Sequence, residues 1–223
     1  MSFDRGKVVL DISMSLDGFI AGPKPSLEQP LGAGGERLHE WIFGLASFRE
    51  RHGESGGVRN ADDEVVAESL AATGAVVMGR RMFSGGEGAW GGDPNAEGWW
   101  GDTPPFHAPV FVLTHHAREP QEMREGTTFT FVTDGVESAV EQAKAVAGDK
   151  NVSVGGGAST IQQALKAGLV DELQVHVAPL FLGGGVRLFD DPGIAQIELE
   201  GTRVLSSPEV THLKFRIVRN GGA

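Results

Sequence analysis

The chain has 223 residues, a net charge of −11, and 40% hydrophobic against 22% charged residues. This length suits one domain, or one domain with long insertions, and the composition supports a folded core rather than a disordered chain. Because non-specific nucleic-acid binding depends on Lys and Arg, the acidic balance argues against that class of function.

The chain contains no cysteine. This excludes disulfides, thiolate nucleophiles and zinc sites built on cysteine, and it fits a reducing cytosol. The first residues hold no apolar stretch typical of a signal peptide, and no segment approaches the roughly 18 apolar residues of a membrane span. We expect a cytoplasmic protein that binds neither nucleic acid nor membranes and has no metal site.

Short apolar runs alternate with helical patterns along the first two thirds of the chain. The runs that predict buried strands are 8–12, 75–78, 110–113, 129–132 and 152–154. Helices are predicted to start at Asp62, to run from a cap at Asp134 to Gly148, and to run from Ser159 or Thr160 to Gly168. Strands that alternate with helices indicate a mostly parallel sheet covered on both faces.

The last third has a different pattern. Leu173, Val175 and Val177 alternate with polar residues, and a short Ser-Ser-Pro turn joins the segments 197–205 and 210–218. This pattern predicts a terminal antiparallel pair of strands.

Three segments are predicted to be loop insertions in one domain spanning 1–223. They lie around 22–35, 51–60 and 85–108. The last one carries three tryptophans among Gly and Pro, which is unusual for large apolar side chains unless they cover something.

The strongest local signal for ligand binding is a strand that leads into three glycines and then a helix, at 152–160. Glycine lets the backbone approach a ligand closely, and the free N–H groups at a helix start favour a phosphate. The segment is not a P-loop, because no Gly-Lys-Ser/Thr follows, and Thr160 replaces the third Gly of a dinucleotide fingerprint. Phosphate binding is one interpretation, and a tight strand–helix turn is the other.

Two further strand ends carry groups suited to an anion. Gly79 is followed by Arg80 and Arg81 at a helix start, where two cations oppose the helix dipole and an anion would compensate them. Thr114 and His115 follow the next strand, at the edge where open α/β sheets bind ligands. A solvated basic patch and exposed loop histidines are the alternatives. Together, the three strand ends suggest one extended phosphorylated ligand, such as a dinucleotide.

Four segments resemble the dihydrofolate-reductase-like superfamily, and most closely the reductase domain of the riboflavin biosynthesis deaminase–reductase. They are SLDGFIAG at 15–22, VVMGRR at 76–81, VGGG at 154–157 and DELQVHVAPLFLGGGVRLF at 171–189. The resemblance implies a three-layer α/β fold, with about eight mostly parallel strands, helices on both faces and a C-terminal antiparallel hairpin. It also implies an NADPH-dependent reductase that forms a homodimer.

The resemblance assigns roles to individual positions. The implied cofactor-binding residues are Ser13, Gly79, Arg80, Arg81, Thr114, His115, Gly155, Gly156, Gly157, Ala158, Ser159 and Thr160. Ser13 would contact the nicotinamide amide through its backbone, and Thr114 and His115 would lie beside the adenosine ribose and its 2′-phosphate. Gly155 and Gly156 would form a glycine pair, often joined by a cis peptide in the family.

Reduction by hydride transfer also needs one proton. Asp17, His39 and Glu40 are the candidates to place or relay it, and water is an alternative. Asp17 would lie in the first turn, by the loop that closes over the nicotinamide.

Substrate contacts are predicted from aromatic and cationic residues. Trp41 and Trp90 could stack on a heteroaromatic ring, although core packing explains Trp41 equally well. Arg187, with Lys24 and Arg37, is available for a substrate phosphate.

Two departures from the relatives narrow the reaction. Leu38 replaces the acid that binds the pteridine ring in folate reductases, which argues against true dihydrofolate reduction, and the deaminase zinc site is excluded because the chain has no cysteine. The leading prediction is a reductase of the 5-amino-6-(5-phosphoribosylamino)uracil type. The alternatives are a pterin or xenobiotic carbonyl reductase on the same fold, and a non-catalytic nucleotide-binding protein.

Overall fold

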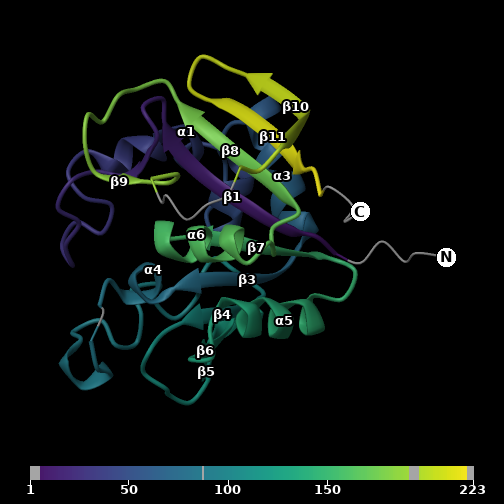
Figure 1. Ribbon diagram of the computed structural model, residues 1–223. Coiled ribbons are helices and arrows are strands. Elements are labelled where there is room, and N and C mark those ends of the chain that lie inside the picture. Colours follow the sequence, from purple (N-terminus) through teal and green to yellow (C-terminus); the bar gives the residue numbers. More distant parts are fainter. Residues whose placement is uncertain (1–5, 87, 191–195, 220–223) are drawn as a thin grey trace.

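The computed structural model describes residues 6–86, 88–190 and 196–219, and its centre is a nine-stranded sheet (Figure 1). The strands are β1 (Val8–Ser15), β3 (Thr73–Gly79), β4 (Pro109–Leu113), β5 (Gln121–Glu122), β6 (Thr128–Val132), β7 (Asn151–Gly156), β8 (Glu172–Ala178), β10 (Leu199–Ser206) and β11 (Thr211–Ile217). Their order is β10-β11-β8-β1-β7-β3-β4-β6-β5. Two further short strands, β2 (Phe19–Ala21) and β9 (Val186–Arg187), pair with each other. Residues 1–5, which belong to the segment where the sequence predicts no signal peptide, lie outside the described part.

The predicted architecture is confirmed. All five expected central strands are present, and β1, β3, β4, β6, β7 and β8 run parallel. The expected C-terminal pair, β10 and β11, is antiparallel and joins the sheet beside β8. The two-residue edge strand β5 was not predicted, because so short a segment carries no periodic pattern.

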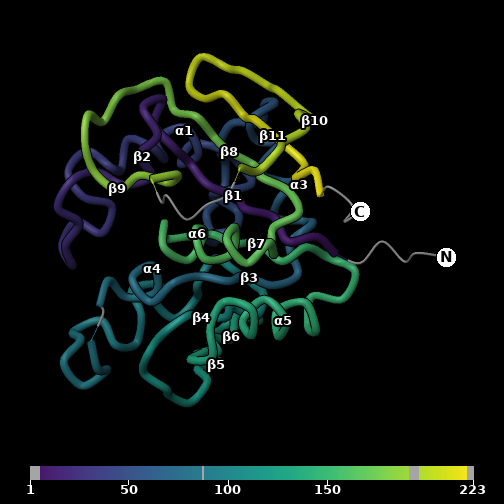
Figure 2. Tube along the Cα trace, viewed as in Figure 1, coloured from purple at the N-terminus to yellow at the C-terminus, as the bar shows by residue number. Residues whose placement is uncertain are grey.

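Helices cover both faces of this sheet (Figures 1 and 2). They are α1 (Glu40–Phe43), α2 (Ala46–Arg51), α3 (Ala61–Ala72), α4 (Arg80–Ser84), α5 (Val136–Ala147) and α6 (Ala158–Lys166), with the 3-10 turns η1 (Gly35–Leu38), η2 (Trp90–Gly92) and η3 (Arg124–Gly126). Helices α5 and α6 pack on one face of β1, β3, β4 and β7 through a large apolar cluster. Helices α1 to α4 lie on the other face. No described helix is both long enough and apolar enough to cross a membrane.

The three predicted helices exist, but their starts differ from prediction. Asn60, rather than Asp62, caps α3, because its side-chain oxygen accepts a hydrogen bond from the N–H of Asp63 at 2.9 Å. Such a cap contributes about 1 kcal/mol. Glycines precede the other two helices: Gly135, with φ of 95°, precedes α5 in place of Asp134, and Gly157 precedes α6. A glycine can break an extended chain into a helix without a side-chain signal.

The second face of the sheet is apolar in one half and polar in the other. Over β3, β4 and β6 it carries an apolar cluster, which includes Phe83 and the partly buried Trp90 and Trp100 of the loop 85–108. Over β1, β8 and β11 it carries buried polar residues: Ser13, Gln174, His176 and His212. The alternation expected for β8 is present, but its polar side chains are buried under α1 and α3 instead of facing solvent.

The long loops extend from the edge where the parallel strands end. In Figure 1 the arrowheads of β1, β3 and β8 point to the left, and the loops 22–35 and 85–108 lie on that side. The two loops meet near Gly85, where Leu27 and Trp99 would both come within 3.0 Å of an added Cβ. The segment 51–60 instead joins α2 to α3, and an isolated β-bridge between Val58 and Leu45 fixes its position.

Candidate active site

The centre of the carboxyl edge is a close contact between β3, β7 and α6. Met78 pairs with Gly156, and Gly79 leads into α4. A Cβ on Gly79 would lie 2.5 Å from Oγ1 of Thr160. Because real Cβ atoms do not come within 3.0 Å of another atom, only glycine permits this approach. The structure therefore brings the starts of α4 and α6 together, as an extended anionic ligand requires.

The glycine triplet is packed on one side and open on the other. A Cβ on Gly155 or Gly156 would contact Met82 at 3.5 Å, whereas a Cβ on Gly157 would meet none of the described atoms within 4 Å. The cis peptide joins Gly156 to Gly157, one residue later than the pair expected from the resemblance. The Gly157 end therefore offers free backbone at the start of α6.

Arg80 is the buried cation of this edge, with only 7% of its surface exposed. Its Nη2 donates to the carboxylate of Asp93, and its guanidinium lies 3.6 Å from the centre of the Trp90 ring. Its Nε and Nη1 are buried and have no hydrogen-bond partner among the described residues. Buried donors without a partner cost free energy, and an anion would satisfy them. Arg81, on the same helix start, is exposed.

Asp93 lies in the loop 85–108 and forms an ion pair with Arg80. Burial alone would raise its pKa, but hydrogen bonds from Ser84 (2.7 Å) and Arg80 lower the pKa below the usual range. The carboxylate is therefore ionised at neutral pH and already neutralises part of the charge of Arg80. Sequence reasoning missed Asp93, because nothing in a Gly-rich loop shows which strand end it will reach.

The two tryptophans predicted to bind substrate both have protein partners. The N–H of Trp90 donates to the backbone oxygen of His116 at 2.8 Å, and its ring packs on Phe131 with a centroid distance of 5.0 Å. Trp90 therefore fixes its loop to the β4–β6 half of the sheet. Trp41 is 5% exposed and packs in the β1–β8 half, so the two rings do not form one binding surface. Both rings pack on protein groups, Trp41 fully and Trp90 in part, and substrate stacking on either ring stays a prediction.

The first turn, after β1, is held by Asp17. Its carboxylate accepts hydrogen bonds from the Ser15 hydroxyl (2.6 Å) and from the N–H groups of Leu182 (3.1 Å) and Gly183 (2.8 Å). The bond from Ser15 is the main reason that the pKa of Asp17 is lowered. An ionised carboxylate with these partners is a poor proton donor, so its geometry fits a role in placing the turn against the late loop.

Arg187 lies beside the turn that Asp17 holds. Its Nη1 donates to the backbone oxygen of Asp17 at 3.1 Å, and its guanidinium lies 4.4 Å from the Phe19 ring centre. The strand that carries it, β9, pairs with β2, and η1 packs on β2 as well. Arg187 and Arg37 are exposed on β9 and η1, and Lys24 is exposed in the loop 22–35 that joins β2 to η1. The three cations named from the sequence are thus placed at one end of the edge.

His39 and Glu40 lie where η1 passes into α1. Nδ1 of His39 is buried and has no hydrogen-bond partner among the described residues. Burial lowers the pKa of His39, and the charge of nearby His176 lowers it further. Glu40 is exposed. His39 therefore has an unused polar atom in the interior, and Glu40 does not.

The other predicted cofactor residues line the same edge. Ser13 is buried near the end of β1, and Thr114 is buried at the end of β4, where its hydroxyl accepts from the N–H of His116 at 3.1 Å. His115 is exposed beside it. Within the described residues, no group of three His, Asp or Glu side chains is arranged to hold a metal ion.

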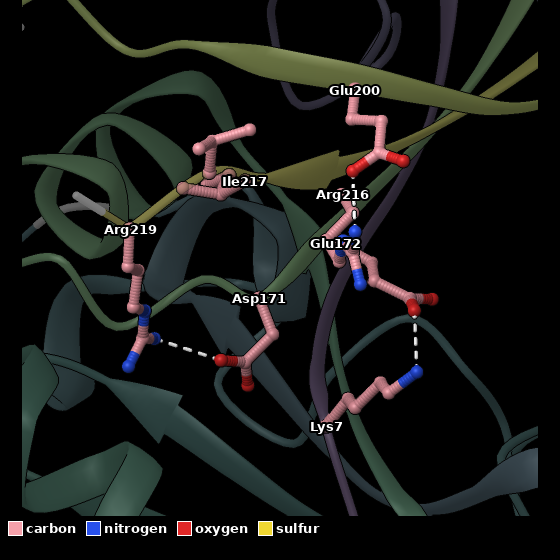
Figure 3. Close-up of a pocket in the computed structure, with 8 residues that line it drawn as sticks. Lys7, Asp171, Glu172, Glu200, Arg216, Ile217 and Arg219 are labelled. Atoms are coloured by element: carbon pink, nitrogen blue, oxygen red, sulfur yellow. Dashed lines mark hydrogen bonds and ion pairs between the residues drawn. The ribbon is translucent and has the colours of Figure 1, made fainter. Parts of the chain in front are cut away.

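An open groove also lies at the opposite edge of the sheet (Figure 3). It measures about 490 Å³ and lies where β1 and β8 begin. Its charges are paired with one another: Lys7 with Glu172 at 2.7 Å, Arg219 with Asp171 at 2.7 Å, and Arg216 with Glu200. A groove whose charges are already neutralised presents little to a ligand, so the carboxyl edge remains the candidate site.

Solved structures of known proteins share this fold. RibD from Acinetobacter baumannii aligns with a TM-score of 0.59 and 18% identity, over 98% of this chain and 60% of that chain. A protein from Shewanella sp. PV-4 assigned to riboflavin biosynthesis aligns with a TM-score of 0.64 and 21% identity, over 96% of this chain and 99% of that one. The diaminohydroxyphosphoribosylaminopyrimidine deaminase/5-amino-6-(5-phosphoribosylamino)uracil reductase of Thermotoga maritima aligns with a TM-score of 0.55 and 17% identity. The alignment covers 96% of this chain and 57% of that chain. A search of curated sequences finds no match.

The family follows from the sequence match. At these identities the solved structures establish only the shared fold. The model of the RibD C-terminal domain, however, matches residues 6–213, which is nearly the whole chain. The chain therefore belongs to the RibD C-terminal domain family, a riboflavin-pathway reductase family.

Proposed function

We propose that this protein is an NADPH-dependent reductase of the 5-amino-6-(5-phosphoribosylamino)uracil type. The observation that carries the proposal is Arg80, which is buried at the carboxyl edge with two unpartnered nitrogens beside the joined starts of α4 and α6. The residues present fit a dinucleotide phosphate, because charge, free N–H groups and glycine backbone converge there.

Different residues along the carboxyl edge would have different roles in this reaction. The nicotinamide supplies a hydride when bound. Gly79, Gly157 and Thr160 would hold the phosphates, with Thr114 and His115 beside the adenosine ribose, while the backbone of Ser13 would orient the nicotinamide amide. Because the lowered pKa of His39 leaves it neutral near pH 7, His39 would relay a proton from water and would not store one.

The cations at the nicotinamide end support a phosphorylated substrate. Arg187 donates to the turn that Asp17 holds, and the exposed Arg37 and Lys24 lie on η1 and in the loop that leads to it from β2. A ribose phosphate needs such a group of exposed cations, and a pterin or a simple carbonyl compound does not. Leu38, fully buried where folate reductases carry their acid, also speaks against a pterin. We further propose a homodimer that works in the cytoplasm.

Calorimetric titration with NADPH and NADH tests the cofactor half of the proposal. We expect NADPH to bind at least tenfold more tightly, because NADH lacks the 2′-phosphate that would lie beside Thr114 and His115. Oxidation of NADPH by the phosphoribosylaminopyrimidine, with its dephosphorylated analogue and dihydrofolate for comparison, tests the substrate half. Binding without turnover of any of them would favour a non-catalytic nucleotide-binding protein, and no binding would end the reductase hypothesis.

Replacing Gly79 by Ala is expected to weaken NADPH binding by about tenfold or more. The new Cβ would lie 2.5 Å from Oγ1 of Thr160, so α6 must move away from α4 and widen the phosphate site. The double variant Gly79→Ala/Thr160→Ala removes the atom that clashes and, with it, a hydroxyl proposed to hold the phosphates, so it should recover only part of the affinity. Gly44→Ala, whose Cβ meets no described atom within 4 Å, is the control. Equal affinity in all four proteins would show that this contact does not shape the site.

A further inference from the structure

The polar half of the second face contains a continuous chain of four side chains, of which Asp62, His176 and His212 are buried and Asp11 is partly buried. Asp11 of β1 accepts from Nε2 of His176 at 2.8 Å, and Asp62 of α3 faces Nε2 of His212 at 3.0 Å. Between them, the Nδ1 atoms of the two histidines lie only 2.6 Å apart. Both imidazoles are at most 5% exposed. The two histidines therefore link β8 to β11 through their facing Nδ1 atoms. Their carboxylate partners extend this link to β1 and α3.

This geometry fixes the number of protons on the pair. Each Nε2 faces a carboxylate and so carries a hydrogen. Between the two Nδ1 atoms there must be one proton: with none, two lone pairs would face each other, and with two, the N–H groups would collide. Three protons on four nitrogens make one imidazolium and one neutral imidazole, so the pair carries a single shared positive charge.

The surroundings stabilise this single charge. Burial alone would raise the pKa of Asp11, but the charge and hydrogen bond of His176 lower it, so the carboxylate is ionised. The pKa of His212 is lowered, first by burial and then by the charge of His176, which fits the neutral member of the pair. Besides Asp11 and Asp62, the titratable group facing the pair is the neutral His39, from the turn before α1. Further along β11 and β8, Lys214 and Glu172 pair with each other at 3.0 Å.

The pair touches the candidate site through Trp41. The indole of Trp41 packs on both imidazoles, at centroid distances of 4.9 Å from His176 and 5.1 Å from His212. Its N–H donates to Oγ of Ser13 at 3.2 Å, and Ser13 is the strand neighbour of His176. Ser13 is the residue proposed to hold the nicotinamide amide. Any change that separates the imidazoles therefore moves the ring that fixes Ser13.

We propose that His176 and His212 are positioning residues that share one proton, and that this singly charged state holds Trp41 and Ser13 in place for hydride transfer. The positioning role rests on the proposed function, whereas the shared proton does not. Neither histidine donates a proton to substrate, because both nitrogens of each ring are occupied within the chain. The pair sets the geometry and leaves the proton relay to His39 or water.

Nuclear magnetic resonance of the ¹⁵N-labelled full-length chain tests the shared proton without any ligand. We expect one strongly downfield proton correlated with two histidine nitrogens, which disappears in His212→Asn and in His176→Asn. It should persist in His52→Asn, a matched control at an exposed position. Two neutral rings without a bridging proton, in a folded wild-type chain, would overturn the shared proton.

The pH profile of NADPH oxidation tests the positioning role. The wild-type kcat should fall on both sides of an optimum, since either a second proton or loss of the first separates the rings. His212→Asn should lower kcat on the order of 10²-fold, with KM for the cofactor little changed. Asp62→Asn, which keeps the shape of the buried side chain, should move the alkaline limb to lower pH, because one carboxylate less stabilises the shared charge.

The possible failures can be told apart. A downfield proton that is present, with pH profiles of Asp62→Asn and wild type that coincide, would overturn the positioning role alone. Absence of NADPH binding and turnover in the wild type would overturn the proposed function and the positioning role together, and the resonance would still decide on the shared proton.

Discussion

The double variant Arg80→Met/Asp93→Asn is expected to bind NADPH about 10- to 100-fold more weakly than the wild type. Hydrogen bonds to charged groups contribute about 1.5–3 kcal/mol each, and Arg80 offers two free nitrogens at the proposed phosphate site. Asp93 is changed together with Arg80, because a buried carboxylate left without its partner would destabilise the loop. Calorimetry measures the affinity; fluorescence is unsuitable, since Arg80 stacks on Trp90.

Two controls isolate the role of the guanidinium. Asp93→Asn alone keeps the charge of Arg80 but weakens its internal partner, so it should bind NADPH at least as tightly as the wild type. Arg216→Met removes an exposed arginine at the opposite edge and should change nothing. If the double variant binds like the wild type, Arg80 has no part in holding the cofactor.

Phe83→Ala is expected to lower the free energy of unfolding by about 3–5 kcal/mol. Phe83 is fully buried and lies edge-on to Phe129 and Phe131, at centroid distances of 4.9 and 5.2 Å. It also supports Trp90 at 6.0 Å, so the cavity would form where the loop 85–108 meets the sheet. Chemical denaturation followed by circular dichroism measures the change.

Phe181→Ala is the matched control for this cavity. Phe181 is 72% exposed, so its loss should change the free energy of unfolding by no more than about 0.5 kcal/mol. A Phe83→Ala variant as stable as the control would mean that the loop does not depend on this aromatic cluster.

Much of the fold could be predicted from the sequence, because parallel strands buried on both faces give continuous apolar runs such as 110–113. The helix starts were less predictable. Before α5 and α6 the chain turns at glycines, which leave no capping side chain to recognise. The joined starts of α4 and α6 were implied by the glycines, because such residues mark close approach of backbone.

The buried polar chain could not be predicted. His212 meets Asp62 across 150 residues of sequence, and His176 meets Asp11 across 165. No local pattern encodes such pairs, since they depend on the order of the strands and on where α3 lies. The positions of Trp41 and Trp90 are the same kind of problem: a tryptophan in a segment without periodicity shows only that something will be covered.

The pairing of Arg80 with Asp93 has a consequence for how fast the cofactor arrives. A protein with a net charge of −11 repels an anionic dinucleotide at long range, and the buried arginine, already matched by a carboxylate, projects little field into solvent. Arg80 therefore adds almost nothing to electrostatic steering of the encounter. Recognition begins only after contact, when the phosphate can compete with Asp93 at short range. Arg80 therefore contributes to selection through the dissociation rate of the ligand and not through its association rate.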